Sequence, residues 1–250
     1  MKYTVLGSGS CVPDPRKNSS GGIVEINKTF MMVDCGTGVL HTIPKTKYDY
    51  MNIDAVLLTH LHLDHVNDFA ALLFAYRNDP GIRRTKDLHI FAPIGFNKFF
   101  SYLQKLYEET IEPRTCKVVI REVGETSFDF QDIHIQTYKT DHTENSIGYR
   151  FEYNGEILVI TGDTGFHKNI IELCKDADLA VIECSFPREL NKGKHLNPKV
   201  ITKIVTEAKV KKVVLTHLYP MIEDYPILET IAKDFTGGIT IAEVGKSYEI

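Results

Sequence analysis

A dense group of side chains that bind metals, placed directly after an apolar segment, constrains this chain more than any other feature. The segment Thr59-His60-Leu61-His62-Leu63-Asp64-His65 contains three histidines and an aspartate, all within its last six residues. The preceding residues 56–58 are typical of the end of a buried strand, and the apolar spacing from His65 onward is helical. The group therefore lies where a strand turns into a helix, so its side chains can converge.

The spacing within this group indicates two neighbouring binding points. His60 and His62 are two residues apart, so in extended backbone their side chains point the same way. Asp64 and His65 follow where the chain turns and can face a second point nearby. We expect two metal ions side by side. The alternative, a polar loop with surface histidines, is disfavoured because the group is dense and has partners elsewhere in the chain.

Composition narrows the class of protein. The 250 residues are 43% hydrophobic, which predicts one compact domain over residues 1–250. A net charge of −4 disfavours a broad face for nucleic acid. Three basic clusters, Arg16-Lys17, Arg83-Arg84 and Lys192/Lys194, are expected to be solvated surface.

The cysteines and the hydropathy pattern predict a soluble cytoplasmic protein. The five cysteines are odd in number and contain no CxxC pair, which is typical of reduced thiols. The N-terminal residues run straight into a strand, and no apolar run approaches the length needed to span a membrane. We therefore expect no membrane association.

The order of elements predicts an α+β fold with two sheets packed face to face and helices outside. In both halves, strands run first in meanders and then alternate with helices. A strong turn signal, Asn154-Gly155, joins one hairpin. Strands are expected at residues 3–6, 23–26, 30–33, 53–58, 88–91, 118–122, 128–130, 133–139, 146–153, 156–161, 179–183, 212–216, 239–243 and 247–250, and helices before residue 53, from 65, and at 94–107, 167–175 and 198–208.

Three further candidate ligands lie at the ends of predicted strands in the second half. His142 follows Thr140-Asp141, Asp163 lies in Thr161-Gly162-Asp163, and His217 ends an apolar run. A lone histidine at a strand end is more often structural, but three such sites together with the first group favour a shared centre. Zinc accepts imidazole and carboxylate ligands, and a catalytic site leaves a position for water.

In this order the candidate residues resemble the metallo-β-lactamase superfamily over essentially the whole chain. The resemblance implies a four-layer αββα sandwich with two Zn²⁺ ions, Mn²⁺ or Fe²⁺ being alternatives, at the edge of the sheets. Asp163 would bridge the ions, and Asp34 would orient their ligands. The resemblance assigns His60, His62 and His142 to one metal, and Asp64, His65 and His217 to the other.

Within the superfamily the chain is most similar to the ribonuclease Z-like phosphodiesterases. The similarity is carried by LGSGSCVPDPRKNSS, VDCGTG, Ile182-Glu183-Cys184-Ser185, His195 and Leu215-Thr216-His217. It implies that Glu183 and His195 pair beside the metals and that His195 contacts the scissile phosphate or protonates the leaving group. Asp64 could also assist the nucleophile. The alternative for His195 is a surface histidine in a lysine-rich loop.

One departure from that branch bears on the substrate. Ribonuclease Z usually has a long arm that binds tRNA. This arm is inserted in the sequence between the third histidine site and the bridging aspartate. Here His142 and Asp163 are separated by only 20 residues, which one hairpin fills. We therefore expect a dinuclear hydrolase of small or cyclic phosphodiesters, nucleotides or RNA ends.

Three alternatives stay open for the function and its partners. They are tRNA 3′ processing, with an arm placed within residues 78–114 or lent by the second subunit of a homodimer; hydrolysis of a thioester or lactone; and a non-catalytic metal-binding protein. Thioester and lactone hydrolases resemble this chain in the same ligand set, so the metal motif does not separate them from phosphodiesterases.

Overall fold

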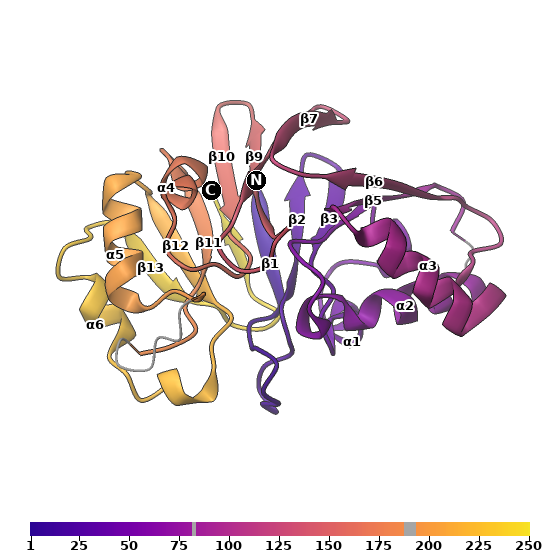
Figure 1. Cartoon of the computed structure of the whole chain (residues 1–250), viewed down its shortest axis with the longest axis horizontal. Helices are drawn as coiled ribbons and strands as arrows, with labels where there is room; N and C mark the ends of the chain where they lie inside the picture. Colours follow the sequence, from indigo (N-terminus) through magenta and orange to yellow (C-terminus); the bar gives the residue numbers. More distant parts are fainter. Residues whose placement is uncertain (82–83, 188–193) are drawn as a thin grey trace.

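The computed structural model describes residues 1–81, 84–187 and 194–250 and contains two seven-stranded sheets (Figure 1). The first sheet has the order β14-β1-β2-β3-β4-β5-β6. Its strands from β14 to β3 are antiparallel, and those from β3 to β6 are parallel. Their bounds are β1 Lys2–Gly7, β2 Gly21–Ile26, β3 Thr29–Val33, β4 Ala55–Leu57, β5 Leu88–Pro93, β6 Val118–Val123 and β14 Ser247–Glu249.

The second sheet has the order β13-β12-β11-β10-β9-β8-β7. It begins as an antiparallel meander from β7 to β10, and β10 to β13 are parallel. The β9–β10 hairpin turns at Asn154 and Gly155, both with positive φ (51° and 80°), as a tight hairpin turn requires. The bounds are β7 Thr126–Phe130, β8 Ile133–Lys139, β9 Ile147–Tyr153, β10 Glu156–Ile160, β11 Leu179–Glu183, β12 Lys212–Thr216 and β13 Gly238–Ile241.

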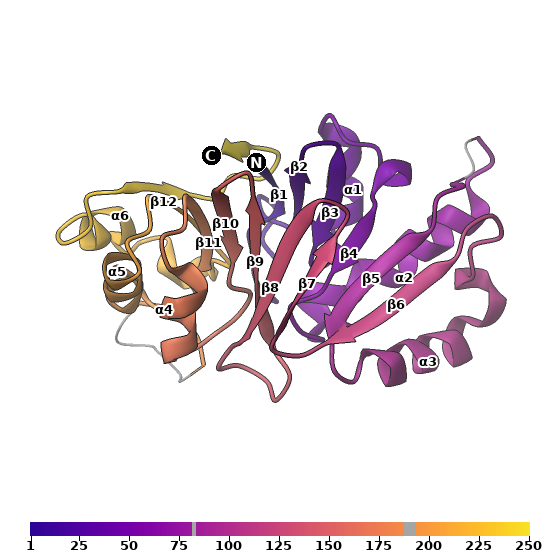
Figure 2. The same ribbon diagram turned by 90° about the horizontal axis from the view of Figure 1, so that it is seen from above.

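Helices cover the outer face of each sheet (Figure 2). The first sheet carries α1 Val39–Thr42, α2 Leu63–Asn78 and α3 Phe96–Tyr107, with 3₁₀ turns η1 Ile43–Lys45, η2 Tyr50–Asn52 and η3 Glu108–Ile111. The second carries α4 Lys168–Cys174, α5 Pro198–Glu207, α6 Ile227–Ile231 and η5 Pro220–Ile222. This arrangement of helix, sheet, sheet and helix layers confirms the predicted α+β sandwich.

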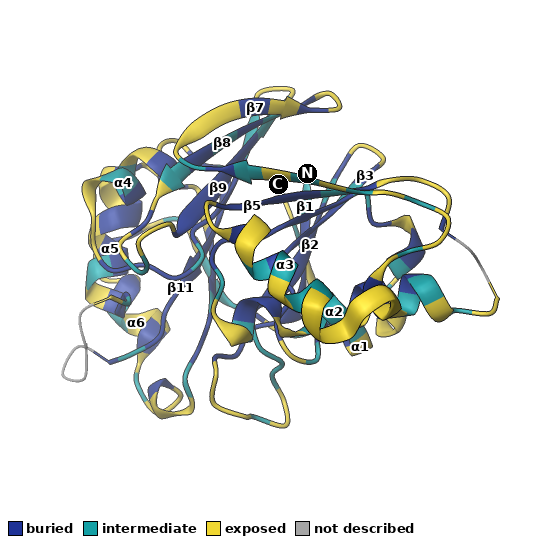
Figure 3. Ribbon diagram, turned by 45° about the vertical axis from the view of Figure 1, so that its right-hand side comes forward, coloured by how far each residue is buried: buried dark blue, intermediate teal, exposed yellow. Residues whose placement is uncertain are grey.

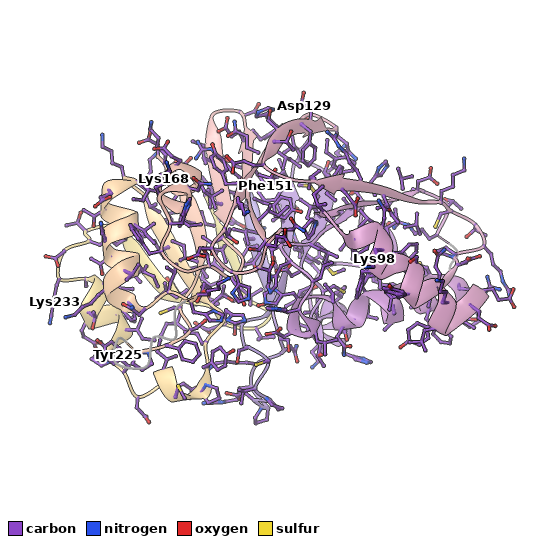
Figure 4. The ribbon with its side chains drawn as sticks, in the orientation of Figure 1. Lys98, Asp129, Phe151, Lys168, Tyr225 and Lys233 are labelled. Atoms are coloured by element: carbon purple, nitrogen blue, oxygen red, sulfur yellow. The ribbon has the colours of Figure 1, made fainter. Side chains whose placement is uncertain are left out.

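Three apolar clusters hold the layers together, and Figure 3 shows the buried strands between exposed outer helix faces. The central cluster joins the inner faces of both sheets and includes Tyr149, Phe151 and Val24. The other two lie beneath α1–α3 and beneath α4–α6. In Figure 4 Phe151 lies inside the sandwich, whereas Lys98 and Lys233 lie on its outer surface. Alternating burial along strands such as β8 is the expected result of packing on one face.

The predicted elements are found, with several local differences. The strand expected at residues 53–58 covers only Ala55–Leu57. The helix expected from His65 begins at Leu63, so Asp64 and His65 lie in its first turn. The last strands are shorter than expected, because β13 ends at Ile241 and β14 covers only three residues. The short helix α6 follows Pro226 and was not predicted.

The prediction that Arg84 is solvated was wrong. Arg84 is 2% exposed, and its guanidinium donates to the carbonyl oxygens of Met51 and Asp87 and lies over the ring of Tyr76. Arg16 is exposed as expected, and both Arg16 and Lys17 pair with Glu223. Arg83 and Lys192 lie outside the described residues. No helix among the described residues is long and apolar enough to cross a membrane.

Candidate metal centre

The candidate ligands meet at one edge of the molecule because their strands run in the same direction. In the second sheet, β8, β10, β11 and β12 are mutually parallel, so the residues that follow them share an edge. From this edge the backbone N–H of Ile147 donates to the carbonyl of Thr59, which follows β4 in the first sheet. The structure thereby brings all the predicted ligands together from both halves.

Three histidines form the first group. The Nδ1 of His62 lies 3.1 Å from the Nε2 of His60 and 3.0 Å from the Nε2 of His142. His60 is buried, His142 is partly buried and His62 is exposed. Three imidazole nitrogens that converge in this way can hold one metal ion and leave an open side toward solvent.

Asp64, His65 and His217 form the second group, and Asp163 lies between the two groups. The Nε2 of His217 is 3.4 Å from Asp64 Oδ2. Asp163 Oδ2 is 3.2 Å from His217, 3.7 Å from His142 and 3.9 Å from His60, all measured to Nε2. Its Oδ1 is 3.4 Å from the Nε2 of His65. Asp163 thus lies within 3.9 Å of histidines from both groups.

Two buried atoms in this cluster need a cation between them, which can be a metal ion or a proton. His65 Nε2 and Asp163 Oδ1 are buried without a hydrogen-bond partner among the described residues. His65 Nδ1 donates to Asp34 Oδ2 at 2.8 Å, so in the neutral ring Nε2 carries a lone pair that faces a carboxylate oxygen, which only accepts. Without a metal ion, burial favours the neutral ring, but Asp163 and Asp34 outweigh it and raise the pKa of His65 well above its ordinary value, so a proton on Nε2 then lies between the two atoms. Two buried acceptors that face each other are unfavourable unless a cation lies between them. The residues therefore fit divalent metal binding.

Asp34 holds two of these histidines from behind. Besides His65, it accepts from the backbone N–H of Thr59 at 2.8 Å and from the Thr59 hydroxyl. The Thr59 hydroxyl in turn lies 3.1 Å from His60 Nδ1. The segment that carries Asp34 packs against α2 so closely that a Cβ on Gly36 would lie 2.1 Å from the Asp64 carbonyl oxygen. This glycine is therefore required by the close approach.

Glu183 occupies a corresponding place in the second sheet. Its Oε1 accepts from His195 Nδ1 at 2.9 Å and from the Thr164 N–H at 3.0 Å, and its Oε2 accepts from the Ser185 hydroxyl at 2.6 Å. His195 lies against the cluster, with its ring centroid 4.9 Å from that of His142. The predicted Glu183–His195 pair is thus formed beside the candidate ligands.

Comparison with known proteins identifies the family of this chain. The model of the family described as Anti-Pycsar protein Apyc1 matches residues 1–237. The chain belongs to this family. The probable metallo-hydrolase YhfI of Bacillus subtilis is 28% identical over 255 residues, with full coverage of both chains. The crystal structure of YhfI, described as a metallo-β-lactamase fold protein, superposes with a TM-score of 0.85 over 99% of each chain at 25% identity.

Ribonuclease Z enzymes are also similar to this Apyc1-family chain. That of Archaeoglobus fulgidus is 24% identical over 308 aligned residues, covering 100% of this chain and 98% of the relative. Human tRNase Z, short form, has the same fold, with a TM-score of 0.79, 20% identity, and coverage of 100% and 99%. The protein is a metal-dependent hydrolase of the ribonuclease Z-like branch of the metallo-β-lactamase superfamily.

Burial and charge set the protonation of the Apyc1-family centre. Burial holds the pKa of His60 well below its ordinary value and lowers that of His142, which favours the neutral imidazole that binds metals. For His195 burial acts in the same direction, but the hydrogen bond to Glu183 outweighs it and raises the pKa. For Asp163 burial favours the acid, but His217 and His65 outweigh it and the pKa is well below its ordinary value.

A small cavity opens beside the first group of histidines. It has a volume of about 190 Å³ and is lined by His60, His62, Pro93, Ile94 and residues 143–145. Neither lysine nor arginine occurs among the described residues that line it. The described residues thus leave a small cavity that no lysine or arginine lines, and Lys194 lies nearby, where its amine donates to the His142 carbonyl at 2.8 Å.

Sequence reasoning missed three groups that contact the candidate ligands from behind. They are the hydroxyls of Thr59 and Ser185 and the Lys194 carbonyl, which lies 3.1 Å from His142 Nδ1. The only available signal was that Thr59 adjoins His60 and that Ser185 lies two residues after Glu183. A backbone carbonyl leaves no signal in the sequence.

Proposed function

We propose that this protein hydrolyses small or cyclic phosphodiesters at a centre of two divalent metal ions, Zn²⁺ by preference with Mn²⁺ or Fe²⁺ as alternatives. The observation that carries the proposal is the place of His195. Its ring nitrogen lies within 4.8 Å of ligand atoms of His142 and Asp163, and it also groups with Glu183 and His217. A histidine at this place, held by a carboxylate, is suited to proton transfer.

The residues divide the work between binding and proton transfer. When bound, the metals would polarise the phosphoryl oxygens and lower the pKa of water. His60, His62 and His142 would hold one ion, Asp64, His65 and His217 the other, and Asp163 both. His195 stays protonated to higher pH because Glu183 stabilises its charged form, so it can donate a proton to the departing alkoxide. Asp64, partly exposed at the rim, would assist in orienting the nucleophile.

The preference for a small substrate rests on the surroundings of the site. The cavity beside it is about 190 Å³, and between His142 and Asp163 the chain forms only the β9–β10 hairpin and its flanking turns. A tRNA-sized ligand would need many basic contacts. The alignment with the Archaeoglobus ribonuclease Z spans 308 residues for a chain of 250, so that relative contains segments that this chain lacks, whereas the alignment with YhfI spans 255.

Three features support our proposals that the protein is a single domain, lies in the cytoplasm and forms a homodimer. The central cluster draws side chains from both sheets, which supports a single domain over residues 1–250. All five cysteines are free, which supports a reducing cytoplasm. Tyr102 and Leu106 on α3 are 56% and 69% exposed, and this apolar surface supports a homodimer.

One comparison of rates tests the proposal. The metal-loaded protein is assayed on 2′,3′- and 3′,5′-cyclic nucleotides, bis-p-nitrophenyl phosphate, pre-tRNA and S-lactoylglutathione. We expect the highest kcat/KM on a small phosphodiester and little cleavage of pre-tRNA at moderate salt. Pre-tRNA cut at its 3′ end with a kcat/KM tenfold higher or more would instead establish the tRNA-processing alternative. Preference for S-lactoylglutathione would establish the thioesterase.

A further inference from the structure

We infer that Ser185 is a positioning residue, which fixes the orientation of His217 and ties it to the Glu183–His195 pair. The inference rests on the proposed function only in taking His217 as a metal ligand. It adds a residue to the reaction's machinery that acts through other side chains.

The distances around Ser185 favour one assignment of its hydrogen bonds. The hydroxyl also lies 3.2 Å from the His217 carbonyl oxygen, which is a more distant acceptor than Glu183. A serine hydroxyl has one hydrogen to donate, and Glu183 Oε2, at 2.6 Å, is the nearest acceptor. The hydroxyl oxygen must then accept from His217 Nδ1, which is 3.0 Å away. His195 Nδ1, at 3.3 Å from the hydroxyl, is closer to Glu183 Oε1 at 2.9 Å and donates there.

This assignment decides which nitrogen His217 offers to a metal. With its hydrogen on Nδ1, the ring carries its lone pair on Nε2, which faces Asp163 Oδ2 at 3.2 Å and Asp64 Oδ2 at 3.4 Å. The backbone of His217 has φ of 55°, in the left-handed region that histidine enters more often than most residues other than glycine. A ring flipped by 180° about its Cβ–Cγ bond would place the Cδ2–H group against the Ser185 oxygen and lose the bond, and the other tautomer would place a lone pair there.

Burial makes the arrangement costly to break. Ser185 is fully buried, and Glu183 and His217 are each 1% exposed. Removal of the hydroxyl would leave Glu183 Oε2 and His217 Nδ1 without this partner and away from water, which is unfavourable. The ring of His217 would then lose the contact that fixes its tautomer.

The first half of the molecule contains the same device. There Asp34 accepts from the Thr59 hydroxyl, and the hydroxyl oxygen lies 3.1 Å from Nδ1 of His60. In both places, hydrogen bonds therefore connect a carboxylate through a hydroxyl to an imidazole that faces the candidate metal ligands. Because two unrelated segments of the sequence build this arrangement, the position of Ser185 is explained by its link to His217 and not by local packing alone.

The test measures metal binding and the tautomer of His217, apart from activity. In Ser185→Ala we expect the affinity for one of the two Zn²⁺ ions, measured by competition with a chromophoric chelator, to fall about 10–100-fold, the usual cost of losing such a partner. Ser185→Thr, which keeps the hydroxyl, should restore it. Thr202→Val is the matched control, since its buried hydroxyl bonds to the Pro198 carbonyl in α5.

The same variants separate this inference from the proposed function. Unchanged affinity for both ions in a folded Ser185→Ala protein overturns the inference, whatever the substrate. Failure of the wild type to hydrolyse any phosphodiester overturns the proposed function and leaves the metal result standing. Should Ser185→Ala not fold, long-range ¹H–¹⁵N spectra of the Zn²⁺-loaded wild type decide: hydrogen on Nδ1 of His217 supports the inference, and hydrogen on Nε2 overturns it.

Discussion

Each sheet places one buried carboxylate behind the candidate ligands, Asp34 in the first sheet and Glu183 in the second, and the two differ in the residues to which they hydrogen-bond. Asp34, after β3, reaches His65 directly and His60 through Thr59. Glu183, at the end of β11, reaches His217 through Ser185 but reaches His195 directly. Both branches of Asp34 thus end on candidate ligands, whereas one branch of Glu183 ends on the proposed proton donor. In the proposed function, Asp34 supports metal binding alone, whereas Glu183 supports both metal binding and proton transfer.

Asp163 is where the two halves depend on each other, so its removal should have the largest effect. Asp163→Ala leaves the histidines of both groups without the buried charge that offsets two cations. Metal analysis should give about two ions per wild-type chain and well under one for the variant, with activity lost in parallel. Asp234→Ala, an exposed substitution, is the control. A variant that keeps two ions would remove Asp163 from the bridging role.

His195→Ala tests the chemical branch of Glu183. The variant should keep both metals, because His195 is not among the proposed ligands, while kcat falls roughly 10²–10⁴-fold, the usual scale for a general acid. The loss should shrink for p-nitrophenolate, a leaving group that needs no proton. Equal losses for good and poor leaving groups would contradict the role as an acid, and loss of metal would make His195 a ligand.

The contrast between the two carboxylates also shows what sequence could and could not predict. The candidate ligands could be predicted from the sequence, because each follows an apolar strand and parallel strands end at one edge of a sheet. The hydroxyl links could not, because Thr59 is 25 residues from Asp34 and its bond depends on the register between β3 and β4. Arg84 was taken for surface because its partners are carbonyls, which sequence does not mark. The helix α6 is five residues long, too short for a periodic pattern.

Asp34→Asn and Glu183→Gln compare the two carboxylates directly. Asp34 has φ of 58°, a conformation that asparagine tolerates, so the backbone should be kept. Three donors point at the carboxylate, and an amide offers one acceptor oxygen to them. We expect metal affinity in Asp34→Asn to fall about 10–100-fold. Glu183→Gln should lower kcat more than metal affinity. A larger loss of metal affinity in Glu183→Gln than in Asp34→Asn would contradict the different roles proposed for the two carboxylates.

The smallest effect is expected at Thr59, where only a neutral hydroxyl links Asp34 to His60. Thr59→Ser keeps that hydroxyl and should leave Zn²⁺ affinity within about threefold of wild type, since the bond to His60 Nδ1 is preserved. Thr59→Val keeps the shape but removes the link, and one ion should bind about tenfold more weakly. Chelator competition on both variants measures the difference. Because the Thr59 backbone N–H still donates to Asp34, Asp34 and His65 should stay in place, so a loss of both ions in Thr59→Val would mean that the hydroxyl supports the whole centre and not His60 alone.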